Sequence, residues 1–177
     1  RTGDVEQFMD FNSFIDAFKK QLKYFCNLEA EINNKDILYR GSREGYSVRS
    51  LFTADCVKNG RGILMGGARY NNVQLECIGI TNAADSLMAI KKAVFEEKKI
   101  SFRELIDALT SNFHGYDELR KYLRSLPKYG NDIEEVDRLR AEITEYVFCE
   151  LNKQKGILGG KYIPGEVIFV AHEDNGR

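Results

Sequence analysis

Residues 66–80 read GGARYNNVQLECIGI. Gly66 and Gly67 leave the backbone bare just before Arg69 and Tyr70, and no apolar spacing of 3.6 residues follows them. Such a stretch predicts turns and extended chain. Amphipathic helices are predicted on both sides of it, so this segment marks the point where strand structure enters a helix-rich chain.

The chain before this segment predicts a long helix over residues 14–32. Asn12 or Ser13 is its expected N-cap, and residues 33–36 (NNKD) are expected to break it. One helical stripe carries Phe14, Phe18, Leu22, Phe25 and Leu28. Further apolar residues widen that stripe, namely Ile15, Tyr24, Cys26 and Ile32. A stripe this broad predicts packing partners on more than one side of the helix.

The other predicted helices come from the same periodicity and from capping residues. Residues 49–60 predict a short helix, and residues 81–99 a longer one with Asn82 as its cap. Residues 101–113 and 133–151 follow expected capping boxes, Ser101 with Glu104 and Asp132 with Glu135. A further helix is predicted over residues 116–126, and Pro127 is expected to end it.

The C-terminal stretch YIPGEVIFVAH, residues 162–172, predicts a strand. Its apolar run from Val167 to Val170 does not alternate with polar residues, which is typical of a strand covered on both faces in a parallel sheet. The fold class predicted from these patterns is α/β and helix-rich, with too few strands to complete a sheet of its own.

Composition restricts the classes of function. The chain has 177 residues and a net charge of −1, which does not favour nucleic acid or an anionic membrane as the main partner. No apolar run approaches the roughly 18 residues of a membrane span. No hydrophobic signal-peptide core follows Arg1, and a chain that begins in this way is expected to be a piece of a longer one.

Metal and nucleotide sites are not indicated. The cysteines, Cys26, Cys56, Cys77 and Cys149, form no CxxC pair, and the chain has only 2 histidines, so reduced buried thiols are expected and no metal site. The glycines at 60, 62, 66 and 67 suggest a phosphate-binding loop. However, no lysine follows in the GKS/T manner, and the spacing departs from GxGxxG.

Two residues are candidates for a catalytic role. Cys77 follows Glu76, but neighbours on extended chain point to opposite faces, so a structural thiol is favoured over a nucleophile with an adjacent base. His172 lies at the end of the predicted final strand, where functional side chains often project in α/β folds. A hydrogen-bonded structural histidine is the alternative there. Physical reasoning on its own predicts an α/β piece and no particular activity.

Four blocks of sequence, in order, carry a family resemblance. They are DCVKNGRGILMGGARYN, NAADSLMAIKKAVFEEKKIS, LPKYGNDIEEVD and GGKYIPGEVIFVAH, and together they reach from residue 55 to residue 172. In sequence, spacing and order they resemble the glycyl radical enzymes, the group that contains pyruvate formate-lyase. The GGARYN motif is similar to the dehydratase and decarboxylase branch of that group.

The resemblance implies a ten-stranded α/β barrel in a much longer parent enzyme. Residues 1–177 would form a single partial domain, an internal helix-rich piece of the pyruvate formate-lyase-like barrel. This piece would lie between the catalytic cysteine of a G-C-x-E motif and the radical glycine of an R-V-x-G-Y motif, so that it contains no catalytic residue. Residues 43–46 (REGY) look like the radical loop, but they precede GGARYN, whereas the family's radical glycine follows it.

The resemblance also implies chemistry and partners for the parent enzyme. A radical S-adenosylmethionine activating enzyme would install the glycyl radical, and this piece would bind no cofactor or metal itself. The parent would be a cytoplasmic, oxygen-sensitive lyase or dehydratase of anaerobic metabolism, with a small organic substrate such as a diol, an amino alcohol or an aryl acid. It would be a homodimer, without nucleic-acid or membrane partners.

Within this piece, Ile168 and Val170 stand where the family commonly has hydroxyl residues that line the substrate pocket. They would give a less polar substrate wall. Gly66 and Gly67 would let the backbone pass close to neighbouring elements, with Arg69 and Tyr70 tying that strand to adjacent chain by hydrogen bonds. The alternative function is a non-catalytic helical interaction module descended from such an enzyme. A spare part that repairs a damaged enzyme is weakened by the missing radical glycine.

Overall fold

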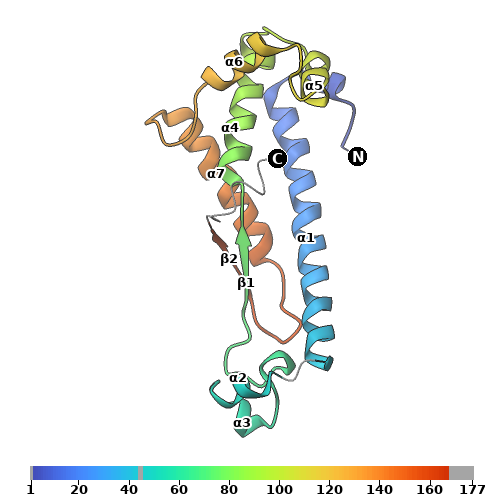
Figure 1. Cartoon of the computed structure of the whole chain (residues 1–177), viewed down its shortest axis with the longest axis vertical. Helices are drawn as coiled ribbons and strands as arrows, with labels where there is room; N and C mark the ends of the chain where they lie inside the picture. Colours follow the sequence, from blue (N-terminus) through green and yellow to red (C-terminus); the bar gives the residue numbers. More distant parts are fainter. Residues whose placement is uncertain (1, 44–45, 168–177) are drawn as a thin grey trace. The chain divides into compact units, whose positions relative to one another are not determined.

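The structure is a computed structural model that describes residues 2–43 and 46–167. Its helices are α1 (Phe11–Arg43), α2 (Ser47–Leu51), α3 (Cys56–Asn59), α4 (Ile80–Ile90), α5 (Phe102–Thr110), α6 (Asp117–Ser125) and α7 (Glu134–Asn152). Its strands are β1 (Val73–Cys77) and β2 (Tyr162–Glu166). Short 3₁₀ helices cover Val5–Gln7 and Ile63–Met65, and a π-helix covers Lys91–Glu96. This is the helix-rich α/β class that the sequence predicts (Figure 1).

The chain divides into two compact units. The first contains residues 1–21 and 79–146, and the second contains residues 22–78 and 147–177. The boundaries at residues 21–22 and 146–147 lie inside helices α1 and α7 rather than in linkers. The two units are described separately below.

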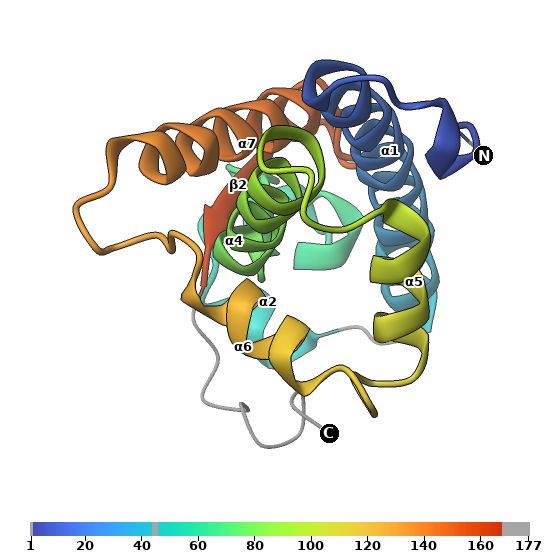
Figure 2. The ribbon, with the colours of Figure 1, turned by 90° about the horizontal axis from the view of Figure 1, so that it is seen from above.

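The first unit is helical and its core is apolar. Ala93, Ile100, Leu105 and Leu126 are buried together where α4, the π-helix, α5 and α6 meet (Figure 2). Five phenylalanines form an aromatic cluster in the same unit, with the ring centroids of neighbouring pairs 5.3–6.4 Å apart: Phe8, Phe11, Phe14, Phe95 and Phe102. The Ser101 hydroxyl accepts the Glu104 N–H at 3.1 Å, which confirms the predicted cap of α5.

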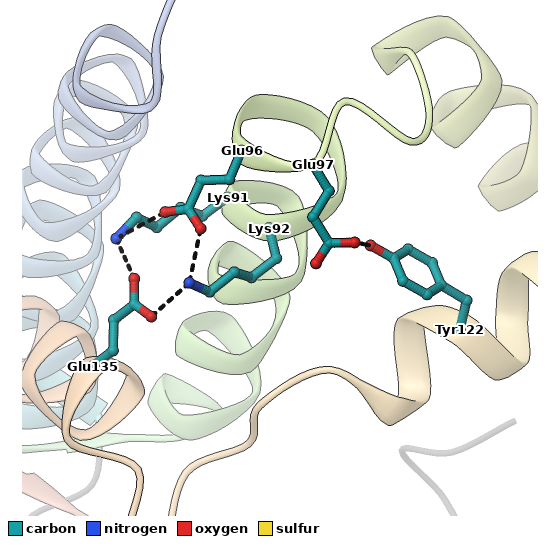
Figure 3. A network of polar contacts seen from close by, with 6 residues as sticks. All are labelled: Lys91, Lys92, Glu96, Glu97, Tyr122 and Glu135. Atoms are coloured by element: carbon teal, nitrogen blue, oxygen red, sulfur yellow. Dashed lines mark hydrogen bonds and ion pairs between the residues drawn. The ribbon is translucent and has the colours of Figure 1, made fainter.

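The π-helix at Lys91–Glu96 carries an ion-pair network (Figure 3). The Glu135 carboxylate on α7 accepts from Lys91 at 2.5 Å and from Lys92 at 2.7 Å, while Glu96 pairs with both lysines at 3.5 and 2.7 Å. Both lysines belong to the π-helix, and Glu135 belongs to the first turn of α7. The wider π turn is therefore tied to a contact between helices.

The second unit contains a two-stranded parallel sheet. Val73 on β1 pairs with Tyr162 on β2, and the register continues to Cys77 opposite Glu166 (Figure 1). The strand expected over residues 162–172 is confirmed for Tyr162–Glu166, whereas residues 168–172 lie outside the described residues. The residues that the structure describes thus supply two strands, which is fewer than a closed barrel needs.

The predicted break at residues 33–36 is wrong, because α1 runs through it to Arg43. No glycine or proline interrupts this stretch, so nothing in the backbone forces an end. Asn34 is instead held from outside the helix: its side chain donates to the Lys155 carbonyl at 3.1 Å and accepts the Ile157 N–H at 2.9 Å. These bonds offset the weak helix propensity of asparagine.

Several predicted helix ends also differ. Asp10 caps α1 in place of Asn12 or Ser13, since its carboxylate accepts the Ser13 N–H at 2.7 Å. Helix α4 begins at Ile80, directly after Gly79 at φ +82°, so Asn82 lies inside the first turn. The Asp132–Glu135 box does not form, because Asp132 adopts φ +61° and Glu135 turns toward the lysines. The single helix expected at 49–60 is split into α2 and α3.

Candidate functional site: the glycine-rich loop and the parallel strand pair

The loop before β1 is built on backbone positions that only glycine fills well. Gly66 has φ +78°, and a Cβ on Gly67 would lie 1.9 Å from the Arg61 carbonyl oxygen. The Gly67 N–H donates to the Gly62 carbonyl at 3.1 Å, and the Asn59 side chain donates to the Gly67 carbonyl at 3.0 Å. A close backbone approach at Gly67 is thus present, but its neighbour is the preceding turn of the same loop and not the neighbouring element that was expected.

Arg69 ties the loop to the residue before α3. Its Nε and Nη2 donate to the two carboxylate oxygens of Asp55 at 2.9 and 3.0 Å, in the bidentate geometry that arginine favours. The hydrogen bonds from Arg69 lower the pKa of Asp55, and the same bonds raise the pKa of Arg69. The tying role expected for Arg69 is confirmed. It is not confirmed for Tyr70, whose side chain is 79% exposed and has no hydrogen-bond partner among the described residues.

Two asparagines make hydrogen bonds where the glycine-rich loop joins β1. The Asn71 side chain donates to the Ala68 carbonyl at 3.0 Å, and the Asn72 side chain accepts the Lys161 N–H at 3.1 Å. A Cβ on Gly160 would lie 1.8 Å from the Asn71 carbonyl oxygen, so the chain before β2 passes directly against the chain before β1. These contacts fix the register in which Val73 starts opposite Tyr162.

Tyr162 holds the start of β2 to α1. Its side chain is 1% exposed, and its hydroxyl lies 2.9 Å from the Ala30 carbonyl oxygen and 3.1 Å from Asn34 Oδ1. Burial, and then the negative charge of Glu29, raises the pKa of this phenol. The tyrosine therefore acts as a neutral donor that joins the strand pair to the helix.

Two thiols lie near the other end of the strands. Cys77 is the last residue of β1 and pairs in register with Glu166. Burial raises the pKa of Cys77, with a further contribution from Glu166, and burial also raises the pKa of Cys26, with smaller contributions from Cys77 and Glu150. Raised pKa values keep both thiols protonated at neutral pH, which makes them poor nucleophiles.

The strand places Glu76 and Cys77 on opposite faces. Glu76 is exposed while Cys77 is half-buried, as the alternation along β1 requires. Glu76 therefore does not act as a base on this thiol. The part of the chain that the structure describes holds no cluster of three histidine, cysteine or acidic residues suited to a metal ion.

The residues predicted to line a substrate pocket are Ile168 and Val170, and both lie outside the described residues, as do His172 and the centre of the REGY motif at residues 44–45. What the structure does place is the strand that leads to them. Sequence reasoning did not single out Asp55, Asn71 or Asn72, and their signal was weak, because short polar residues around glycines are also common in ordinary turns.

The described site is thus a scaffold: a clasped glycine loop that sets the register of two parallel strands, the second of which leads to the residues expected to line a pocket. Two parallel strands without further neighbours among the described residues are typical of one part of a larger α/β fold. The chain belongs to the pyruvate formate lyase-like family, whose model matches residues 1–172. Its relatives include glycyl radical dehydratases and lyases.

Individual relatives agree over nearly the whole chain. Trans-4-hydroxy-L-proline dehydratase from Clostridioides difficile is 34% identical over 162 residues, covering 91% of this chain and 20% of that protein. The isethionate sulfite-lyase of Desulfovibrio desulfuricans is 33% identical, covering 99% of this chain and 22% of its own length.

Solved structures give the same result. The B12-independent glycerol dehydratase of Clostridium butyricum is 34% identical, with a TM-score of 0.84, covering 92% of this chain and 21% of that one. The chain therefore spans about a fifth of the length of the relatives it matches. No helix within the described residues is both long enough and apolar enough to cross a bilayer.

Proposed function

We propose that this chain is an internal part of a glycyl radical dehydratase or lyase that acts on a small organic substrate. Its residues 1–177 form one partial domain of a ten-stranded barrel, between the catalytic cysteine motif and the radical glycine motif. The observation that carries the proposal is the contact of Gly160 with Asn71, which joins two of the four sequence blocks in space. The matched fold in a glycerol dehydratase supports it.

In this proposal the parent's glycine stores an unpaired electron, and its cysteine, as a thiyl radical, removes a hydrogen atom from the substrate. The residues of this chain have a different role, which is to hold parallel strands in register and to help exclude water. Such exclusion matters because a carbon-centred radical is quenched by competing hydrogen donors.

Substrate contact is proposed for one segment only. Ile168 and Val170 follow β2 along the chain and would form a less polar wall of the pocket. Replacing them with Ser and Thr in the parent enzyme is expected to shift kcat/KM toward more hydroxylated substrates. A full-length structure in which both side chains are buried away from the catalytic cysteine would remove this assignment.

The parent enzyme is further proposed to be a cytoplasmic homodimer that is activated by a radical S-adenosylmethionine enzyme. The experiment is to read the complete reading frame and then to activate its product without oxygen. We expect G-C-x-E upstream, R-V-x-G-Y downstream, and an electron paramagnetic resonance signal that is lost when that glycine is replaced by alanine. A frame without either motif would contradict the assignment and would favour the non-catalytic module.

A further inference from the structure

A pocket of about 320 Å³ lies in the first unit, between α4, α5 and α6 (the three helices are labelled in Figure 2). Most of its wall is apolar: Ala89 and Ile90 come from α4, Leu105 and Leu109 from α5, and Leu123 from α6. Leu105 belongs to the buried core of the unit, whereas Leu109 is exposed, so the pocket reaches from the core to the surface. Its volume lies at the lower end of the range of roughly 300–1,000 Å³ that is typical of small-molecule sites.

Phe113 completes the apolar wall in a strained backbone conformation. It follows α5 at φ +59°, and Asn112 before it has φ +51°. Bulky residues rarely adopt this left-handed conformation, because the side chain crowds the backbone. The Phe113 N–H donates to the Ala108 carbonyl at 2.6 Å, so the end of the helix holds the residue in place. Strain of this kind is concentrated at ligand sites, and here it keeps Phe113 in the wall of the pocket.

The pocket also has two cations without a carboxylate partner. Lys128 is half-buried, and its ammonium donates to the Leu123 and Leu126 carbonyls at 3.1 and 2.9 Å. An ammonium has three N–H groups, so one of them has no partner among the described residues. Arg124 is exposed and forms no ion pair in the part of the chain that the structure describes.

The single acid in the pocket does not neutralise these cations. Asp85 accepts the Tyr129 N–H at 2.8 Å and forms no ion pair with Lys128 or Arg124. Two cations and one acid leave the lining with one positive charge. A half-buried cation that is held in place without a counter-ion favours the binding of an anion. The pocket thus combines an apolar wall with a fixed positive charge.

We propose that this pocket binds a small monocarboxylate with an apolar body of about six to eight carbon atoms. The body lies against Leu105, Leu109 and Phe113, and the carboxylate accepts the third N–H of Lys128, with Arg124 adding attraction at the mouth. No protein side chain joins a carboxylate to an apolar body of this size, which favours a free molecule over a segment of protein. The site goes beyond the proposed function, because nothing in it depends on radical chemistry.

The test is a ligand-observed NMR titration of the product of the complete reading frame, with heptanoate as the probe. Two matched ligands separate the contributions: heptanamide keeps the apolar body without the charge, and propanoate keeps the charge without most of the body. We expect a dissociation constant of about 0.1–1 mM for heptanoate. Each matched ligand is expected to bind at least about tenfold more weakly. No binding of heptanoate, or equal binding of heptanamide, would overturn the proposal.

Variants locate the ligand within the protein. Lys128→Met is expected to weaken heptanoate binding at least about tenfold and to leave heptanamide binding within about twofold. Arg124→Gln keeps the bonds of Lys128 to α6, and we expect it to weaken heptanoate binding about two- to fivefold. If Lys128→Met changes the circular dichroism spectrum, Arg124→Gln decides the result. Heptanoate binding that is unchanged in the deciding variant would place the ligand elsewhere and would overturn the proposal.

Lys121→Met is the matched control for net charge. Lys121 lies on α6, pairs with Glu118 at 2.7 Å and does not line the pocket. We expect this variant to keep heptanoate binding within about twofold. A loss equal to that in Lys128→Met would also overturn the proposal, because binding would then follow the overall charge. The titration needs no radical activation, so its outcome is separate from that of the proposed function.

Discussion

Gly160 lies so close to Asn71 that a side-chain carbon on the glycine would be 1.8 Å from the Asn71 carbonyl oxygen and 2.7 Å from the Asn72 nitrogen. This contact brings together two sequence blocks that are far apart along the chain. Because the obstructing atoms are backbone, they have no rotamer by which to move aside, and the register of β1 and β2 depends on the bare α-carbon.

Gly160→Ala is accordingly expected to destabilise the protein by about 2–4 kcal/mol, since the clash must separate the two segments that start the sheet. Urea unfolding followed by circular dichroism measures the change. Gly165→Ala is the matched control: it lies in β2, a Cβ there meets nothing within 4 Å, and its φ is not in the left-handed region. If the two variants lose equal free energy of unfolding, the clash with Asn71 is not the cause of the loss.

Tyr162→Phe is expected to cost about 0.5–1.5 kcal/mol, because it removes the buried hydroxyl whose hydrogen the Ala30 carbonyl and Asn34 Oδ1 share. The same denaturation experiment measures it. Tyr24→Phe removes the same hydroxyl from a side chain that is 60% exposed and is expected to change stability by less than about 0.5 kcal/mol. A neutral Tyr162→Phe would mean that water replaces the lost donor.

Glu135→Gln is expected to lower stability by about 1 kcal/mol, the upper end for exposed pairs, because one carboxylate serves both Lys91 and Lys92. The hydrogen bonds from these lysines, Lys91 first, lower the pKa of Glu135. A lowered folded-state pKa gives stability that is present above the unfolded pKa and is lost as pH falls through the folded one. The difference in stability between Glu135→Gln and the unmodified protein should therefore shrink at acid pH and in high salt. Glu134→Gln, at a carboxyl that is 84% exposed, is the near-neutral control.

Tyr122 is expected to titrate at alkaline pH, since burial, followed by its 2.6 Å hydrogen bond to Glu97, raises its pKa to about 12. A folded-state pKa above the unfolded one means that the contribution of Tyr122 to stability is complete below about pH 10 and is lost as pH rises toward 12. Ultraviolet difference titration measures it. Glu97→Gln should move the Tyr122 transition to lower pH, and an unmoved transition would assign the whole shift to burial.

Much of the local structure could be predicted from single stretches of sequence. The long helix over α7 and the cap at Ser101 follow from apolar spacing and from a hydroxyl residue three positions before Glu104. These features depend on neighbours within one or two turns. The errors fall where a distant group decides: Asn34 looks like a helix breaker, but its amide is satisfied by residues 121 and 123 positions away.

The candidate site divides in the same way. The glycines at 66 and 67 and the role of Arg69 were predictable, because a bare backbone beside an arginine indicates close passage and an ion pair. The partner of Arg69 was not, since Asp55 is one of many acids and adopts φ +72°, which the sequence does not signal. Tyr70 was expected to make a hydrogen bond but is exposed. Whether a side chain is buried depends on which distant segments pack against it, and the local sequence does not show this.

The order and content of four sequence blocks were enough to assign the family, and apolar periodicity was enough to place most helices, because both are recorded along the chain itself. The strand register, the carbonyl that excludes a side chain at Gly160 and the contact of the Tyr162 hydroxyl with α1 were decided only by the tertiary structure. Each of these depends on backbone atoms or surfaces brought together from distant positions, and no local pattern of residue types specifies such distances.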